Sequence, residues 1–308
     1  MNVVITGASG FLGSYVVKNC ASFGFNPIVL KRTDSNKSCA TNEGYIAVQA
    51  DNFDNEETIR MLTQYRPKSF LNLAWRGVDA NTRDNAQQVL YNIPYSLATV
   101  RLAHRIGCEQ WVGIGSLSEY GQAVAKVDEN YQALPVTIYG KTKLASAWAT
   151  QALCQSYGMK SVWLRLGSIY GPGDADHWLI PSVIRSLMMG IPPELTPSEQ
   201  ICDYLYVEDA AEAVLHVVKN QINGTFNLGS GNGMSVRKIV TEIQNRLDTV
   251  LKPKIGAKPY SSQQIMHMEA DIQKIADLTG WLPTTPFAEG ITKTINSIKN
   301  KNEINICL

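Results

Sequence analysis

The sequence lacks an apolar run of the ~20 residues that a membrane-spanning helix requires. It also lacks an excess of either charge, because 28 basic residues stand against 27 acidic ones. This balance removes the electrostatic basis for binding nucleic acid or an anionic membrane surface. The first residues show neither the charged start nor the long apolar core of a signal peptide. We therefore expect a soluble cytoplasmic protein with no membrane or nucleic-acid partner.

Metal-binding patterns are missing as well. The 6 cysteines form no CxxC pair, and the 4 histidines do not cluster with them. Zinc sites depend on such spacings, and a disulfide framework is unusual in a chain of this length. The cysteines stand at positions 20, 39, 108, 154, 202 and 307. We expect free thiols in a reducing compartment and no bound metal.

Short apolar runs alternate with helical patterns through the first half of the chain. Buried parallel strands read as continuous apolar runs, and βαβ units place a helix between successive strands. The expected strands are Val3–Thr6, Pro27–Leu30, Tyr45–Gln49, Phe70–Ala74, Gln110–Gly115 and Ser161–Leu166. The expected helices include Gly13–Ser22, Glu56–Tyr65, Asn92–Gly107 and Ile138–Gly158. This order predicts an α/β fold with a doubly wound parallel sheet.

The composition changes after about residue 166. Proline and glycine become dense, as in GPGD at 171–174 and GIPPELTP at 190–197, and the remaining strands are isolated. We predict a first domain over residues 1–166 and a smaller α+β lobe over residues 167–308. The regular segment 203–218 is expected to return to the first domain.

A glycine-rich turn follows the first strand at once. In TGASGFLG, at 6–13, one glycine permits a tight turn, one allows a pyrophosphate close to the backbone, and one packs the helix against the strand. The amides at the start of the following helix favour bound phosphate. This context predicts a Rossmann domain that binds a dinucleotide. The expected contacts from the turn are Gly7, Ser9, Gly10, Phe11, Leu12 and Gly13.

The residue that contacts the adenine ribose, and so distinguishes NAD from NADP, lies about 20 residues beyond the glycines. The second strand ends in Lys31 and Arg32, with no carboxylate for the ribose of NAD. Two cations here would pair with a 2′-phosphate, so we prefer NADP over NAD. The alternative is that both are ordinary solvated charges. Further expected contacts are Asp51 and Asn52 on the adenine ring, and Leu73, Ala74 and Gly167 at strand ends.

A candidate proton-transfer pair lies on the helix expected from residue 138. Tyr139 and Lys143 are four residues apart, so they share one helical face. A nearby ammonium, together with an oxidised nicotinamide, would lower the pKa of the tyrosine. The tyrosine could then exchange a proton with a carbonyl or alcohol while the dinucleotide exchanges hydride. Ser116, at the end of a parallel strand, could orient the substrate oxygen. A surface tyrosine and lysine with no role are the alternative for the bare spacing.

In their order along the chain, these pieces resemble the extended short-chain dehydrogenase/reductase family, in its nucleotide-sugar branch. The matching segments are TGASGFLG at 6–13, GSLSEYG at 115–121, YGKTK at 139–143, IYGPGD at 169–174, CDYLYVEDAAEAV at 202–214, FNLGSG at 226–231 and DIQKIADLTGWLPTTPFAEGITKTI at 271–295. The resemblance implies Ser116, Tyr139 and Lys143 as the catalytic residues, with Lys143 also on the nicotinamide ribose. It also implies a nucleotide diphosphate sugar in the second lobe and a homodimer formed through the Tyr139 helix.

The chain departs from the family pattern at three places. Dehydratases carry an acidic pair after the catalytic hydroxyl, whereas Leu117 and Ser118 stand here, which disfavours a 4,6-dehydratase. An asparagine that touches the substrate is replaced by Ser168, and an arginine on the diphosphate by Cys202. The expected substrate contacts are Trp75, Arg76, Ser118, Ser168 and His177. Lobe packing is the alternative role for Trp75, Arg76 and His177.

These observations predict an NADPH-dependent reductase of a 4-keto-6-deoxy nucleotide sugar, of the kind that supplies deoxyhexoses for surface polysaccharide. The similarity of the run IYGPGD…LIPSVI at 169–184 to 4-ketoreductases favours this activity. The first alternative is a nucleotide-sugar epimerase with tightly bound NAD and no net redox change. The second is a non-catalytic relative that senses a dinucleotide. The base, the sugar and the stereochemistry of the product stay open, because they depend on pocket shape.

Overall fold

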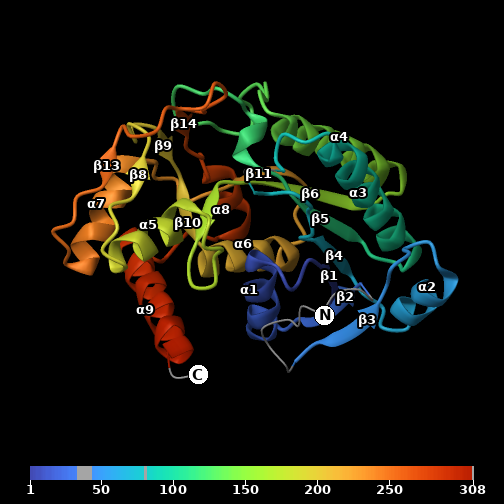
Figure 1. The fold of residues 1–308 in the computed structure, drawn as a ribbon. Helices are drawn as coiled ribbons and strands as arrows, with labels where there is room; N and C mark the ends of the chain where they lie inside the picture. The colour runs from blue at the N-terminus through green and yellow to red at the C-terminus, as the bar shows by residue number, and fades with distance from the viewer. Residues whose placement is uncertain (33–43, 80–81, 307–308) are drawn as a thin grey trace.

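A parallel sheet forms the centre of the molecule. The structure is a computed structural model that describes residues 1–32, 44–79 and 82–306 (Figure 1). Its central sheet has 7 strands in the order β11-β6-β5-β4-β1-β2-β3. The strands are β1 Asn2–Thr6, β2 Asn26–Lys31, β3 Ile46–Gln49, β4 Ser69–Asn72, β5 Gln110–Ile114, β6 Lys160–Leu166 and β11 Gly224–Leu228. All neighbours pair in parallel.

The strand order explains where a ligand would sit. The chain moves outward from β1 to β3 on one side and then crosses to β4 on the other. The crossing leaves a crevice at the carboxyl ends of β1 and β4, where doubly wound sheets bind ligands. The predicted fold class and all six strands expected in the first half are confirmed. Strand β11 was not predicted as part of this sheet, although its residues belong to a matching segment.

Helices cover both faces of the sheet (Figure 1). Helices α3 and α4 pack together on one face, and α1 and α6 pack together on the other. Their bounds are α1 Phe11–Asn19, α2 Glu56–Thr63, α3 Gln87–Arg105, α4 Ile138–Ser156 and α6 Val207–Lys219. The predicted helices are present, but α3 begins at Gln87 rather than Asn92 and continues through Pro94. The early start brings the first turns of α3 to the crevice.

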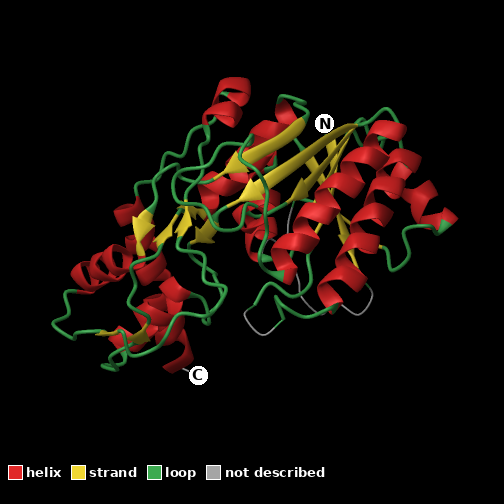
Figure 2. Cartoon of the chain, turned by 90° about the horizontal axis from the view of Figure 1, so that it is seen from above, coloured by secondary structure: helices red, strands yellow, loops and turns green. Residues whose placement is uncertain are grey.

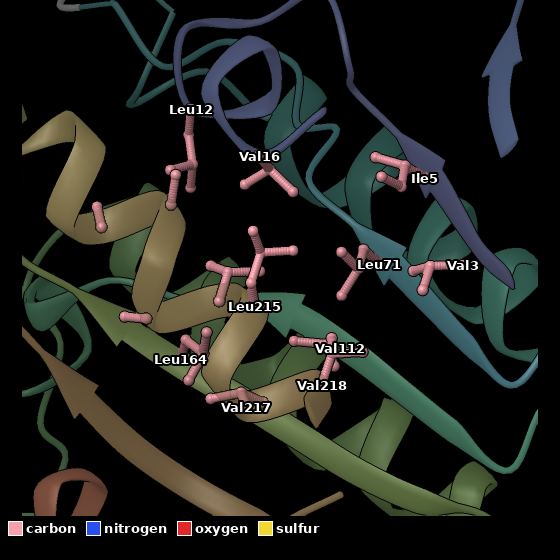
Figure 3. Packing of buried hydrophobic residues seen from close by; sticks show 14 of the residues in the cluster. Val3, Ile5, Leu12, Val16, Leu71, Val112, Leu164, Leu215, Val217 and Val218 are labelled. Atoms are coloured by element: carbon pink, nitrogen blue, oxygen red, sulfur yellow. The ribbon is translucent and has the colours of Figure 1, made fainter. Parts of the chain in front are cut away.

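Two apolar cores hold the sheet between these helices. The core beneath α1 and α6 joins Leu12 and Val16 of α1 to Leu215 of α6, across strand residues such as Ile5 and Leu164 (Figure 3). The other core joins side chains of α3 and α4 to the opposite face, with Trp111 and Trp163 stacked at its centre. Trp111 and Trp163 are fully buried, so each side chain contributes a large buried apolar area to stability.

A second lobe lies to the left of the sheet in Figure 1 and is richer in loops (Figure 2). Its elements are β7 Ser168–Tyr170, α5 Leu179–Met188, β8 Glu194–Leu195, β9 Ile201–Cys202, β10 Tyr204–Tyr206, β12 Met234–Ser235, α7 Val236–Leu247, β13 Lys254–Ile255, β14 His267–Met268 and α9 Phe287–Ile306. Helix α8 Gln273–Thr279 packs instead against β11, with Ile275 in the core beneath α1 and α6. Its core lies among α5, α7 and α9. Helix α6 and strand β11 come from the same half of the chain yet pack with the sheet. The boundary at residue 166 remains a prediction.

The structure also bears on membranes, metals and thiols. No helix in the described part of the chain is both long and apolar enough to span a bilayer. Among the same residues, no three His, Cys, Asp or Glu side chains gather where they could hold a metal. Cys20, Cys108, Cys154 and Cys202 are free thiols. Cys39 and Cys307 lie outside the described residues.

Candidate active site

The glycine turn after β1 has the geometry that the sequence predicted. Gly7 has a φ of +73°, and a Cβ there would lie 2.6 Å from the Ala74 nitrogen at the end of β4. A Cβ on Gly13 would overlap the carbonyl oxygen of Gly7. The Gly7 oxygen accepts a 3.0 Å hydrogen bond from the Gly10 amide, and Gly10 caps α1 without a side-chain cap bond. The first amides of α1 therefore stay available to a phosphate beside a backbone that only glycine can form.

A crevice of about 850 Å³ opens beside this turn, at the carboxyl ends of β1 and β4. Its size suits a dinucleotide, whose pyrophosphate would meet the turn. Ten of the predicted contacts line it: Gly7, Ser9, Gly10, Lys31, Arg32, Asp51, Leu73, Ala74, Trp75 and Arg76. The residues present thus fit the cofactor that the motif predicts.

Besides Tyr139 and Lys143, five other predicted cofactor contacts are not among the lining residues. Leu12 is buried in the apolar core, and Gly13 is covered by Gly7. The Phe11 ring packs edge-on against Tyr15. The Asn52 side chain accepts a hydrogen bond of 2.9 Å from the Asp54 amide, which closes a local turn. Gly167 donates its amide to Leu228 at 2.8 Å, within the strand network.

The residues at the end of β2 and β3 form the outer part of the crevice. The Lys31 ammonium donates a 3.0 Å hydrogen bond to the Tyr45 hydroxyl and lies 5.0 Å from the centre of that ring. Arg32 is exposed at the crevice, and Asp51 lines it from the end of β3. Of the two cations, Arg32 is therefore the one presented outward toward solvent, and Lys31 is held against an aromatic ring.

The three predicted catalytic residues are brought together from two segments. Tyr139 and Lys143 lie on α4, whose first turn is capped by the Thr137 hydroxyl on the Gly140 amide at 3.0 Å. Ser116 precedes the short helix Leu117–Glu119 after β5, and its hydroxyl is within hydrogen-bonding reach of Tyr139. The Lys143 ammonium donates to the Ile114 carbonyl at 2.7 Å. All three are buried.

Burial dominates the protonation of the pair. It raises the pKa of the Tyr139 phenol, against the Arg83 guanidinium and a hydrogen bond with Ser116, which lower it. It also lowers the pKa of the Lys143 ammonium to about 7, while the Glu119 carboxylate raises that pKa and Arg83 lowers it further. The sequence predicted a lowered pKa at Tyr139 through Lys143. Among the protein's own groups, desolvation outweighs the favourable charge, and that charge belongs to Arg83 rather than to Lys143.

Trp75 lies against Lys143, one of the predicted catalytic residues. Its ring centre is 3.4 Å from the Lys143 ammonium, and the ring meets Tyr139 edge-on at 6.2 Å. The indole nitrogen donates to the Gln88 side chain at 2.9 Å, which fixes the ring from α3. Trp75 lines the crevice, whereas Lys143 and Tyr139 do not. The indole therefore touches both the crevice and the pair of Tyr139 and Lys143.

A buried carboxylate supports the Ser116 turn. The Glu119 side chain accepts from the Ser116 amide at 2.9 Å, from the Trp163 indole at 2.9 Å and from the Arg165 guanidinium at 3.0 Å. Glu119 is 0% exposed, so these donors replace its hydration. A Cβ on Gly115 would overlap both Glu119 and Trp163, which explains glycine at this position. The cluster fixes Ser116 relative to β6.

The predicted substrate residues fall into separate places. Ser118 is buried beside the catalytic residues, and Trp75 and Arg76 line the crevice. Ser168 lies on β7, where its amide donates to the Asp203 carbonyl at 3.0 Å. His177 is exposed and packs against the neighbouring Trp178 ring. The structure therefore does not bring Ser168 and His177 to the crevice.

Asp203, which follows Cys202, has a set of hydrogen-bond partners that stabilises the fold. The buried Asp203 carboxylate accepts hydrogen bonds from the Ser230 amide and hydroxyl, both at 2.6 Å, and from the Gly231 and Ala270 amides, both at 3.1 Å. These bonds join segments that are far apart in the sequence. The thiol of Cys202 brings no positive charge to this place.

Several residues of the site were not predicted. Ala8, Tyr91, Asn92 and Tyr95 line the crevice, the last three from α3. The Asn92 side chain holds both backbone groups of Arg76, at 3.0 and 3.1 Å. Arg83, in the segment before α3, lies over the ring of Tyr139. The sequence feature that could have indicated these residues is the connection between β4 and α3, because strand-to-helix connections carry ligand contacts in this class of sheet.

Comparisons with known proteins agree with this fold. A dTDP-glucose 4,6-dehydratase from Escherichia coli is 25% identical, over 98% of this chain and 95% of its own. A dTDP-4-dehydro-6-deoxyglucose reductase from Escherichia coli is 24% identical, over 97% and 98%. The crystal structure of Thermus thermophilus UDP-glucose 4-epimerase in complex with NAD matches with a TM-score of 0.85 at 23% identity, over 97% and 99%.

A family model covers most of the molecule, from residue 3 to residue 229. The matched range includes the glycine turn, the Ser116 turn and the helix of Tyr139 and Lys143. It also includes the central sheet, apart from Asn2 at the start of β1. The chain belongs to the NAD dependent epimerase/dehydratase family.

Proposed function

We propose that this protein is an NADPH-dependent reductase that converts a keto group on a deoxy nucleotide sugar to a hydroxyl. The observation that carries the proposal is the buried set of Ser116, Tyr139 and Lys143 next to a dinucleotide-sized crevice. When bound there, the dinucleotide supplies the hydride. Ser116 orients the keto oxygen, Tyr139 delivers the proton, and Lys143 holds the nicotinamide ribose once Trp75 has moved. The enzyme works in the cytoplasm.

The Ser116 turn argues against dehydration, although a dehydratase is among the similar proteins. Removal of water from the sugar needs an additional acid and base beside the catalytic hydroxyl. Here Leu117 is apolar and buried, and Ser118 carries only a hydroxyl. The nearby Glu119 is held in the interior by Trp163 and Arg165. No carboxylate of this turn therefore points to the substrate.

NADP is proposed over NAD because of the outer part of the crevice. Arg32 is exposed there, and a guanidinium binds a 2′-phosphate through paired hydrogen bonds. A net reductase also needs a reduced dinucleotide from solution in every turnover.

A homodimer through α4 is proposed on the resemblance to the short-chain dehydrogenase/reductase family. Trp148 on this helix is 63% exposed, so a large apolar side chain is available for such a contact. Its solution mass, measured by light scattering, tests the dimer.

Epimerisation is the second candidate, because the solved structure reported above is a UDP-glucose 4-epimerase. An epimerase needs the same serine, tyrosine and lysine, but it keeps its dinucleotide through the cycle. The two activities differ in what the purified protein carries and consumes. An epimerase would retain NAD on purification and interconvert nucleotide sugars without added NADPH.

The experiment follows NADPH absorbance with 4-keto-6-deoxy sugars carried on dTDP, UDP, GDP or CDP. We expect stoichiometric oxidation of NADPH with at least one base, faster than with NADH. Absence of oxidation with all four would end the reductase proposal. Interconversion of nucleotide sugars with no change in absorbance would establish the epimerase instead.

A further inference from the structure

Arg83 is a charged side chain of the site that the proposed chemistry does not use. It comes from the segment between β4 and α3, and its guanidinium carbon lies 4.3 Å from the centre of the Tyr139 ring. One of its nitrogens is 3.4 Å from the Ser118 hydroxyl, which makes a long hydrogen bond. Arg83 thus joins the two segments that carry Tyr139 and Ser116.

The charge of Arg83 has no acidic partner within the described residues. The buried guanidinium on the other side of the Ser116 turn, Arg165, pairs with Glu119 at 3.0 Å. The neighbouring Asp84 is occupied elsewhere, because it accepts the Ile138 amide at 3.0 Å. Arg83 is half-buried and rests on an aromatic face, which compensates only part of the lost hydration. A cation in this state is suited to a ligand that brings the missing negative charge.

Arg83 contacts Tyr139 away from the residues that connect this tyrosine to the cofactor crevice. Trp75 and Lys143 lie along one side of Tyr139 and connect it to the crevice. Arg83 and Ser118 are not among the residues that line the crevice, so their contacts with Tyr139 and with each other lie outside the cofactor crevice. A guanidinium with an adjacent hydroxyl matches a planar carboxylate or a phosphate, since both present several acceptor oxygens.

We propose that Arg83 and Ser118 form an anion-binding subsite that holds an acidic oxygen group of the sugar substrate next to Tyr139. The inference rests on the proposed function for the identity of the site as a nucleotide-sugar site. The short distance from the guanidinium to the tyrosine ring keeps the anion within one sugar ring of the reacting carbon. Two groups of a nucleotide sugar meet this condition. One is the phosphate attached to the first carbon, which the 6-deoxy substrate of the proposed function carries. The other is a carboxylate at the sixth carbon, as in a hexuronate, which would make the substrate an acidic sugar in place of a 6-deoxy sugar.

The test compares Arg83→Gln, Arg83→Lys and wild type in calorimetric binding of UDP-glucuronate, UDP-glucose and UDP, repeated with the dTDP forms. Arg83→Gln is expected to weaken binding of the anion that Arg83 holds by about tenfold or more, and Arg83→Lys by less, because lysine keeps the charge without the paired donors. Arg60→Gln, an exposed change of equal charge on α2, is the matched control. The NADPH-induced shift in melting temperature of each variant reports correct folding.

The outcomes separate the sources of the anion. A loss confined to the glucuronate forms assigns the subsite to a sugar carboxylate, and an equal loss for all probes assigns it to a phosphate. The proposal is overturned if no probe binds wild type more tightly than Arg83→Gln. Binding requires no turnover, so this result is independent of whether NADPH is oxidised in the reductase assay.

Discussion

The two ends of the proposed active site are built by different means. The dinucleotide end consists largely of backbone: a glycine turn, the start of α1 and the small residues that end β4. The catalytic end consists of buried side chains from three segments, with Trp75 and Arg83 placed around Tyr139. The first end is fixed by one short stretch of sequence. The second depends on how distant segments pack.

This difference decides how each end responds to change. At the glycine turn, any added side chain meets backbone that cannot yield, so the effect is on shape. At the catalytic end, the buried charges depend on one another, so removal of one group shifts the protonation of its neighbours. Substitutions at the two ends should therefore give distinguishable defects, in cofactor affinity and in pH dependence.

The largest effect is expected from Tyr139→Phe, which removes the proton donor and leaves the ring packing in place. We expect kcat of the NADPH-dependent reduction to fall by about 10²–10⁴-fold. The affinity for NADPH, measured by fluorescence titration, should stay within a few-fold of wild type. A variant with near-normal kcat would show that the proton comes from another group.

Gly13→Ala tests the dinucleotide end. The added methyl group overlaps the Gly7 carbonyl, so the turn and α1 must shift apart. We expect the affinity for NADPH to fall by about 10²-fold and the free energy of unfolding to fall by about 1–3 kcal/mol, as for an overpacked site. Gly24→Ala is the control for loss of a glycine, since nothing lies within 4 Å of its Cβ position, although its φ of +73° carries its own strain. Equal NADPH affinity in the two variants would contradict the role of the turn.

Glu119→Gln tests the coupling of charges at the catalytic end. The Glu119 carboxylate raises the pKa of Lys143, which burial brings to about 7. Without this charge the pKa falls further, so the ammonium persists only at lower pH. We expect the loss of NADPH affinity with rising pH, centred near 7 in wild type, to move to lower pH. An unchanged midpoint would show that Lys143 does not control binding in this range.

The smallest effect is expected from Arg32→Ala, at the outer part of the crevice. Loss of a guanidinium partner for the 2′-phosphate should weaken NADPH by about tenfold and leave NADH nearly unchanged. Lys219→Ala, an exposed change at the end of α6, is the control for lost charge. If wild type and Arg32→Ala show the same ratio of NADPH to NADH affinity, NADP preference has no basis in this residue.

The same difference between the two ends decides which features of the fold and the site could be predicted from the sequence. The sheet and its helices were predictable because βαβ units leave continuous apolar runs, and the glycine turn because its requirement is local. The spacing of Tyr139 and Lys143 on one helical face was predictable for the same reason. These features depend on neighbours in the chain.

Features that depend on distant segments were not predictable. Nothing near Trp75 in the sequence indicates that its ring covers Lys143, or that Glu119 turns inward to Arg165. Arg83 stands in an irregular segment without periodicity, so its contact with Tyr139 emerges only in the folded chain. Asn52 was expected at the adenine ring, but its side chain closes a turn instead, because short polar residues bond to nearby backbone.

A crystal structure of the protein with NADPH bound would test the central claim most directly. We expect the pyrophosphate at the Gly7–Gly13 turn, the Trp75 indole displaced, and the Lys143 ammonium within hydrogen-bonding distance of the nicotinamide ribose. An indole that still covers Lys143 while NADPH fills the crevice would contradict it, since the catalytic pair would then be separated from the cofactor.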